Sequence, residues 1–359
     1  MSGLPGRTST CKGEHRSRSP MASIEQKFLN LALQGGGTHG AFAWGVLDRL
    51  LEDERILIDG ISATSAGAMN AVTLAYGWTI GGRDGAKNAL AAFWDRIGDA
   101  FRLLQPSWFD RIICDDSLRL SPVFAIAELA TRLFSPYELN PLNINPLRDA
   151  LTASVDFEVL RASKCPIKLF VSATNVRTGK IKVFERQEIC VDRVMASACL
   201  PTLFQAVDID GEHYWDGGYM GNPAMFPLIY NCVSRDIVVI RINPLYRREL
   251  PRTAREINNR VNEISFNSSL MREMRAISFI TGLIDDGHIT GKALNRMLMH
   301  SISADAEVMG LGAASKLNAD KQFLRRLRDA GRRHTERRLA ANFDLLGCES
   351  TIELQKEFL

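Results

Sequence analysis

The stretch from residue 28 to residue 70 constrains this chain more than any other. It holds two small-residue turns, each between an apolar strand pattern and a helix pattern. The first turn follows the apolar run 29–33 and contains Gly35, Gly36 and Gly37. Glycine allows a tight turn with unobstructed N–H groups, and the N-terminus of the following helix adds partial positive charge. This glycine loop is therefore predicted to bind an anion or a developing oxyanion.

The second turn, residues 63–67, reads Ala-Thr-Ser-Ala-Gly and lies between a strand pattern at 56–62 and a small-residue helix pattern at 66–76. A serine between small neighbours at a strand-to-helix turn is typical of a nucleophile elbow, which lifts the hydroxyl clear of the sheet. Taken alone, a serine at the start of a helix is usually only a cap. Next to the glycine loop, the pattern favours Ser65 as a nucleophile.

Strand and helix patterns alternate along most of the chain. Residues 41–53 place apolar side chains on one stripe of a helix, residues 165–185 read as a β-hairpin, and residues 236–242 read as the last core strand. Such alternation indicates a mostly parallel sheet covered by helices on both faces. The predicted fold class is α/β, a three-layer α/β/α architecture with a mostly parallel central sheet and a helical C-terminal extension.

Composition divides the chain into three parts. Residues 1–24 are rich in Ser, Gly and Arg, lack the apolar core of a secretory signal, and are predicted to be a disordered tail. Residues 25–245 form the predicted catalytic domain, and residues 246–359 form a mainly helical extension packed on it, with an edge strand at 297–303. The Pro- and Asn-rich stretch 103–147 is predicted to form irregular loops and short helices that cover the site. Its aromatic side chains either line the lip of the site or cap the core, and the second reading is favoured. These are Trp108, Phe109, Phe124 and Phe134.

Charge and cysteine content limit the partners. A net charge of +3 gives no overall basis for nucleic-acid binding, and no apolar run is long enough to span a bilayer. Seven scattered cysteines without a Cys-x-x-Cys pair predict reduced thiols in a cytoplasmic compartment, and no metal site is expected. The basic segment 321–338 reads either as a face for anionic lipid headgroups or as a solvated helix with its apolar side on the core. The second reading is favoured, and a peripheral contact with a membrane stays open.

Three chemistries compete for the glycine loop. Its Gly-x-Gly-x-x-Gly spacing, from Gly35 to Gly40, matches a dinucleotide fingerprint, which needs an acid at the end of the second strand. Asp59 comes at the start of that strand instead. A Ser–acid–His triad needs a later histidine in a suitable setting. The candidates stand in no recognisable motif; they are His288, His300 and His334.

The third chemistry fits more residues. Four blocks occur in order: Gly-Gly-Gly-Thr-His-Gly at 35–40, the Ser65 turn, Ala-Ser-Ala-Cys-Leu-Pro at 196–201 and Asp-Gly-Gly at 216–218. With these blocks the chain resembles the patatin-like phospholipase family. The resemblance implies a lipid acyl hydrolase that cleaves carboxylic esters with a Ser65–Asp216 dyad and holds the oxyanion on the glycine-loop amides. It also implies a lipid or fatty-acyl ester substrate, and neither a catalytic histidine nor a cofactor.

An aspartate that accepts a proton needs a dry site, so Asp216 is expected to be partly buried. His213 is expected to be a surface strand residue rather than a triad member. Two positions depart from the family pattern: Ala63 replaces the first glycine of the elbow, and His39 stands where an arginine or lysine is usual. These departures leave one alternative, a non-catalytic lipid- or protein-binding protein of the same fold.

Overall fold

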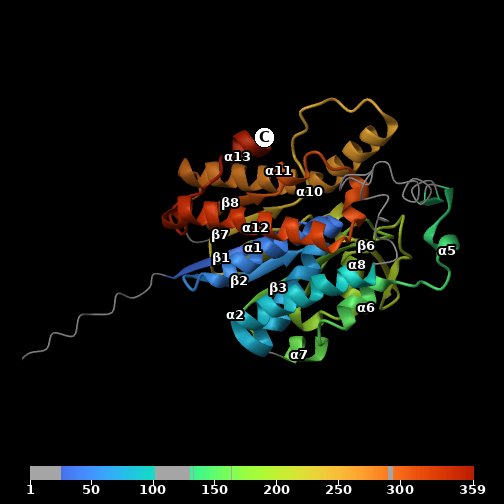
Figure 1. The fold of residues 1–359 in the computed structure, drawn as a ribbon. Helices are drawn as coiled ribbons and strands as arrows, with labels where there is room; N and C mark the ends of the chain where they lie inside the picture. The colour runs from blue at the N-terminus through green and yellow to red at the C-terminus, as the bar shows by residue number, and fades with distance from the viewer. Residues whose placement is uncertain (1–25, 102–129, 132, 163, 290–293) are drawn as a thin grey trace, which may run out of the picture.

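The computed structural model describes residues 26–101, 130–131, 133–162, 164–289 and 294–359 (Figure 1). The predicted N-terminal tail and the aromatic residues Trp108, Phe109 and Phe124 lie outside these residues. Phe134 is 50% exposed, so the prediction that it caps the core is wrong. The reason is its place beside α5 (Pro136–Leu139), a one-turn helix at the periphery of the fold.

One mixed sheet of eight strands forms the centre of the described fold, in the order β5-β6-β3-β2-β1-β7-β8, with β4 paired to β3. Strands β3, β2, β1, β7 and β8 run parallel, whereas β4, β5 and β6 are antiparallel to their neighbours. The predicted mostly parallel sheet, the hairpin and the C-terminal edge strand are confirmed. The strands are β1 (Lys27–Leu33), β2 (Ile56–Ala63), β3 (Lys168–Asn175), β4 (Ile181–Glu185), β5 (Val207–Ile209), β6 (Glu212–Asp216), β7 (Asp236–Arg241) and β8 (Leu298–Ser303).

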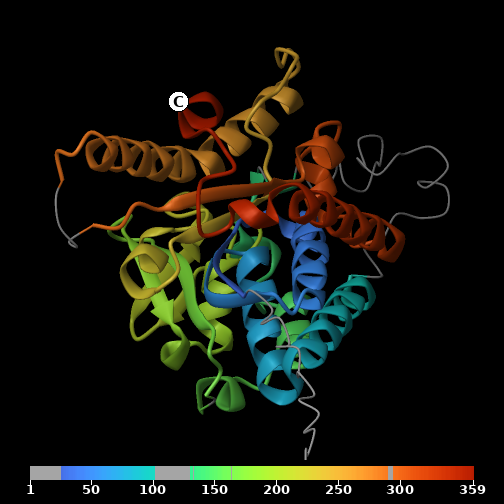
Figure 2. The ribbon, with the colours of Figure 1, turned by 90° about the vertical axis from the view of Figure 1, so that its left-hand side faces the viewer.

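Helices cover both faces of the sheet because its strands bury side chains on both sides. Leu31 and Leu33 of β1 join the core beneath α1, α2, α8 and α12, while Ala32 between them packs with α9, α10 and α13. The two-residue period of a strand sends neighbouring apolar side chains to opposite faces. Figure 2 shows β8 between α10 and α12. The three-layer α/β/α prediction is therefore confirmed.

The helices that cover the two faces of the sheet are α1 (Gly40–Glu52), α2 (Ala66–Ala100), α8 (Val191–Ser197), α9 (Phe226–Asn231), α10 (Ala254–Asp285), α12 (Lys321–Asn342) and α13 (Leu354–Phe358). The described residues also form short helical segments: α6 (Pro146–Thr152), α7 (Phe157–Ala162), α11 (Asp305–Val308), η1 (Gly37–His39), η3 (Arg186–Glu188), η4 (Gly217–Tyr219), η5 (Ala313–Leu317) and η6 (Phe343–Leu345).

The basic segment forms α12, and its apolar side packs on the core as the favoured reading predicts. Phe323 and Leu327 are buried, and Leu339 and Phe343 are partly buried against the same cluster. Arg332 of this helix pairs with acidic side chains of α1. The charge run is thus largely a solvated, ion-paired helix face. Within the described residues, no helix combines the length and apolar character that crossing a membrane would need.

The C-terminal part of the chain shares the central core. Strand β8 pairs with β7, and α12 crosses α1 at glycines on both helices. A Cβ on Gly331 would lie 2.1 Å from the carbonyl oxygen of Phe42, and one on Gly45 would lie 1.9 Å from that of Arg328. Only residues without a side chain let the two backbones approach so closely. The domain boundary at residue 245 stays a prediction, but the sheet continues across it.

This crossing predicts a large cost for one methyl group. Gly331→Ala should lower the free energy of unfolding by about 1–3 kcal/mol or more, because α12 has to move away from α1. Gly282→Ala is the matched control, since Gly282 is also helical and a Cβ there would have no neighbour within 4 Å. It should stabilise the chain by up to about 1 kcal/mol through helix propensity. Urea unfolding measures both, and equal effects would contradict the close crossing.

Candidate active site

The glycine loop and the Ser65 turn meet at the carboxyl ends of β1 and β2, which are parallel neighbours. A Cβ on Gly35 would lie 2.5 Å from the Cβ of Ser65, and one on Gly67 would lie 2.5 Å from the carbonyl oxygen of Leu33. These distances are far inside van der Waals contact, so each turn depends on a glycine facing the other. The predicted proximity of the two turns is therefore a consequence of parallel pairing between the first two strands.

Ser65 occupies the strained position of an elbow. Its backbone has φ 56° and ψ −125°, a conformation that costs a non-glycine residue about 1–3 kcal/mol. Its amide donates a hydrogen bond of 2.9 Å to Oγ of Ser197 in the 196–201 block. The residue is 8% exposed. A strained turn held by neighbouring groups can present a hydroxyl in one fixed direction.

Asp216 ends β6, where it pairs in register with Ala173 of β3. Its amide donates to the carbonyl oxygen of Cys199 at 2.8 Å, and its Oδ1 accepts from the amide of Gly218 at 2.7 Å. The residue is completely buried, more than the partial burial expected from the sequence. Its Oδ2 accepts no hydrogen bond of standard geometry from the described residues, although the Ser65 hydroxyl is near enough to stabilise the charged carboxylate.

Burial raises the pKa of Asp216 to about 7. The amide of Gly218, the Ser65 hydroxyl and the positive charge of Lys316 oppose this rise, because each favours the ionised form. A carboxyl group with a pKa near neutrality can exchange a proton with a hydroxyl at physiological pH far more readily than an exposed aspartate can. The site therefore contains a potential base beside a potential nucleophile.

The three glycines of the loop are not equivalent. Gly35 is fixed on both sides, because its amide donates to Oδ1 of Asn222 and its carbonyl oxygen accepts from Nδ2 of Asn243, each at 2.7 Å. The amides of Gly36 and Gly37 have no acceptor among the described residues. Gly37 has φ 60°, which favours glycine. The free donors of the loop are thus its last two amides.

A set of buried amide side chains anchors the loop, and sequence reasoning missed it. Gln34 accepts through Oε1 from the amide of Asn243 at 3.1 Å and donates through Nε2 to Oδ1 of Asn267 at 3.1 Å. Asn222 and Asn243 then hold Gly35 from the loops after β6 and β7. Polar residues directly after strands were the available signal. Their mutual contacts depend on how β7 and α10 pack, which no local pattern reveals.

The two departures from the family pattern, His39 and Ala63, lie in different environments. His39 is buried and its Nε2 lies 2.9 Å from Oγ of Ser315. Burial, followed by the charge of Lys316, lowers the pKa of His39 to about 3, so the ring is neutral. Ala63 is buried in the main core at the end of β2, where it pairs with Leu33. Neither side chain carries charge to the site.

The polar contacts of the described histidines are with groups other than Asp216. The side chain of His213 is 39% exposed and lies 3.9 Å from Asp208, in agreement with a surface strand residue. His300 hydrogen-bonds Asp236 on β7, and His334 faces Glu307. His288 is exposed. No histidine of the described residues hydrogen-bonds the Asp216 carboxyl, and these residues hold no cluster of three potential metal ligands.

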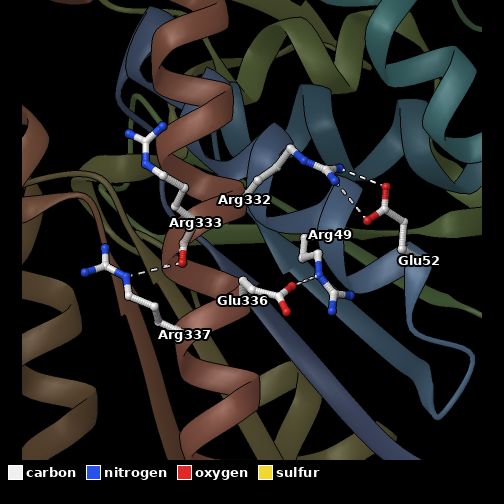
Figure 3. A pocket seen from close by; sticks show the side chains of 6 residues that line it. All are labelled: Arg49, Glu52, Arg332, Arg333, Glu336 and Arg337. Carbon is white, nitrogen blue, oxygen red and sulfur yellow. Dashed lines mark hydrogen bonds and ion pairs between the residues drawn. The ribbon is translucent and has the colours of Figure 1, made fainter.

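An open groove of about 830 Å³ lies on the other end of α1 (Figure 3). Its acids and arginines pair with one another, as Arg332 does with Glu52 at 2.9 Å. Arg49 lies nine residues beyond Gly40, or roughly 14 Å along the helix. The groove is therefore separate from the Ser65 site. It is lined by Arg49, Glu52, Arg332, Arg333, Glu336 and Arg337.

The class that the fold and the site define is a three-layer α/β/α protein with a serine elbow beside a glycine loop. The family model of patatin-like phospholipases matches residues 31–229. The chain belongs to the patatin-like phospholipase family, and this membership supports a lipid ester hydrolase function. The matched residues include all four blocks that carried the resemblance.

Solved structures with a similar fold share little sequence. VipD from Legionella pneumophila is 17% identical, with 86% of this chain and 67% of that chain covered, at a TM-score of 0.36. ExoU, from the ExoU-SpcU complex of Pseudomonas aeruginosa, is 15% identical at a TM-score of 0.35. There the alignment covers 88% of this chain and 52% of that chain, so this chain spans about half the length of ExoU. Likeness at this level carries no argument about activity. No curated protein matches the sequence.

The raised pKa of Asp216 predicts that Asp216→Asn stabilises the folded chain, and that the stabilisation is larger at higher pH. Above pH 7 the native state holds a desolvated carboxylate, whereas the unfolded chain ionises near 3.8, so the stability that the protonated carboxyl contributes is lost as pH rises. At pH 8 the free energy of unfolding of the variant should exceed that of the natural sequence by about 2–4 kcal/mol. At pH 5 the difference should be less than about half as large. Urea unfolding at both pH values measures this.

Asp208→Asn is the control for that comparison, because the side chain of Asp208 is 61% exposed on the neighbouring strand β5. It should change stability little at either pH. If Asp216→Asn and Asp208→Asn behave alike, the carboxyl of Asp216 is hydrated rather than buried.

Proposed function

We propose that this chain is a serine acyl hydrolase that cleaves carboxylic esters of lipids, with Ser65 as nucleophile and Asp216 as base. The observation that carries the proposal is the buried Asp216 carboxyl, whose pKa is raised to about 7 by desolvation, beside a serine on a strained elbow. Family membership supplies the substrate class, a lipid ester. In a protein without catalytic turnover, the raised pKa of Asp216 and the strained backbone of Ser65 would have no function.

The proposed reaction has two halves. Oγ of Ser65 attacks the acyl carbonyl carbon while its proton passes to Asp216, and the carbonyl oxygen becomes an oxyanion. The amides of Gly36 and Gly37 are the proposed donors to that oxyanion, supported by the partial positive charge at the start of α1. Gly35 positions the loop instead, because its amide is engaged by Asn222.

The proton on Asp216 then moves to the leaving alcohol, which departs and leaves an acyl-Ser65 ester. Water attacks this ester, again giving its proton to Asp216, and the oxyanion returns to the same two amides. Collapse of the second intermediate returns the proton to Ser65 and releases the fatty acid. Each step balances without a metal ion or a histidine, because one carboxyl alternates between base and acid.

The proposal also includes the location of the protein. We propose that it is cytoplasmic and makes a peripheral contact with a lipid surface. The segment around α5 exposes large apolar side chains, among them Phe134 and Leu142 at 50% and 81% exposure. Tyr137 accepts a hydrogen bond from the amide of Ala206, in the loop that follows the 196–201 block. Exposed apolar side chains of this kind favour adsorption to a lipid surface.

The nucleophile assignment predicts that Ser65→Ala abolishes turnover. Activity on p-nitrophenyl butyrate should fall at least about a thousandfold, because only Ser65 forms the acyl ester, and labelling by a fluorophosphonate probe should disappear. Ser265→Ala is the matched control, since Ser265 is an exposed residue of α10. Persistence of more than a few per cent of turnover in folded Ser65→Ala would falsify the assignment. Absence of labelling in the natural sequence would favour a non-catalytic protein.

The base assignment predicts an acid limb in the pH profile. Below about pH 7 Asp216 is protonated and cannot accept the Ser65 proton, so kcat/KM should fall about tenfold for each further pH unit. Asp216→Asn should lose activity by orders of magnitude, whereas His213→Ala should lose little because the His213 side chain is exposed. A large loss in His213→Ala with a small one in Asp216→Asn would mean a histidine-based mechanism.

A further inference from the structure

Lys316 reaches the glycine loop from the C-terminal part of the chain, outside the residues matched by the family. Its carbonyl oxygen lies against the loop, since a Cβ on Gly37 would be 2.3 Å from it. Its Nζ donates a hydrogen bond of 2.8 Å to Oδ1 of Asn243. Asn243 in turn donates to the carbonyl oxygen of Gly35. Lys316 thus contacts one end of the loop directly and the other through one side chain.

The same lysine lies near the base. Nζ is 5.8 Å from the centre of the Phe266 ring, and a Cβ on Gly218 would lie 2.5 Å from an atom of that ring. The Phe266 ring therefore lies close to both the ammonium and the turn whose Gly218 amide hydrogen-bonds Asp216. Such a ring excludes water, so the two charges interact through a poorly screened medium. No hydrogen bond or ion pair joins the Lys316 and Asp216 side chains, both of which are described.

The other charged groups around Lys316 leave its charge available to Asp216. Glu263 of α10 is paired with Arg247 at 3.1 Å and Arg260 at 3.2 Å. His39 on η1 is neutral. Burial lowers the pKa of Lys316 to about 8, against the charges of Glu263 and Asp216, while Arg247 lowers it further. The carboxylate of Asp216 and the ammonium of Lys316 each favour the charged form of the other.

We propose that Lys316 is a positioning residue of the acyl-transfer site, which anchors the glycine loop through Asn243 and holds Asp216 in its carboxylate form by its positive charge. This inference rests on the proposed function. Lys316 does not touch the reacting atoms; it sets the protonation state of the base.

The test separates the charge of Lys316 from its hydrogen bond. Lys316→Gln keeps a donor for Asn243 and removes the charge, whereas Lys316→Arg keeps the charge. The measurement is kcat/KM on p-nitrophenyl butyrate, a neutral ester, from pH 5 to pH 9. Lys316→Gln should move the acid limb upward by about one pH unit and lower the rate at pH 6 about tenfold. Lys316→Arg should leave the limb within a few tenths of a unit.

Lys321→Gln is the matched control. It makes the same substitution at a lysine whose ion pair is with Asp99, at the surface. Its acid limb should coincide with that of the natural sequence. An unmoved acid limb in Lys316→Gln would overturn the charge role, even where kcat falls. Lys316→Arg shifted as far as Lys316→Gln would overturn it too. So would a Lys316→Gln effect confined to KM for an anionic ester, since the cation would then bind substrate.

Failure of the inference and failure of the proposed function are distinguishable in the same series. Ser65→Ala and fluorophosphonate labelling are measured alongside the Lys316 variants. If the natural sequence shows no Ser65-dependent turnover or labelling, the proposed function fails and the role of Lys316 fails with it. If Ser65-dependent turnover is present and the acid limb of kcat/KM is unchanged in Lys316→Gln, only the role of Lys316 fails. Thermal unfolding of each variant verifies that the chain is folded.

Discussion

Burial of one carboxyl group, that of Asp216, governs how the rest of the site has to be built. A pKa raised from 3.8 to about 7 means that ionising this group in the folded chain costs about 4 kcal/mol more than in water. That is a large fraction of the 5–15 kcal/mol by which folded domains are typically stable. The amide of Gly218, the Ser65 hydroxyl and Lys316 reduce the cost. The site thus holds a buried carboxyl group whose ionisation destabilises the folded chain near neutral pH.

The second constraint is the contact between two turns that have no room for side chains. Gly35 and Gly67 each face the other turn at a distance that a methyl group would close. The Cβ of Ser65 lies directly against Gly35 in this contact, and the backbone of Ser65 has a positive φ that is strained for a residue with a side chain. The parallel pairing of β1 and β2 maintains the contact, because both strands are buried on both faces. The stability of the central sheet therefore holds the geometry of the elbow.

The C-terminal part of the chain completes the site as well as the sheet. The family match ends at residue 229, yet Asn243, Asn267 and Lys316 lie beyond it and anchor the glycine loop. Their elements are held in turn by α12 crossing α1 and by β8 pairing with β7. His39 is neutral at the position where an arginine or lysine is usual in the family, whereas the cationic side chain of Lys316 approaches the same loop from a distant segment.

The sequence by itself determined the sheet and the two turns, because each depends on local signals. It also supplied the pairing of Ser65 with Asp216 as a hypothesis. Glycines mark tight turns, alternation marks buried strands, and four blocks in order indicated the family. Phe134 was predicted wrongly, since a single aromatic residue does not reveal whether a core lies beneath it. Only the tertiary structure decided that Gly35 has no free amide, that Asp216 is fully buried, and that Lys316 approaches the loop. These depend on contacts between residues far apart in the chain, and the packing of α10 and η5 against the sheet is what creates them.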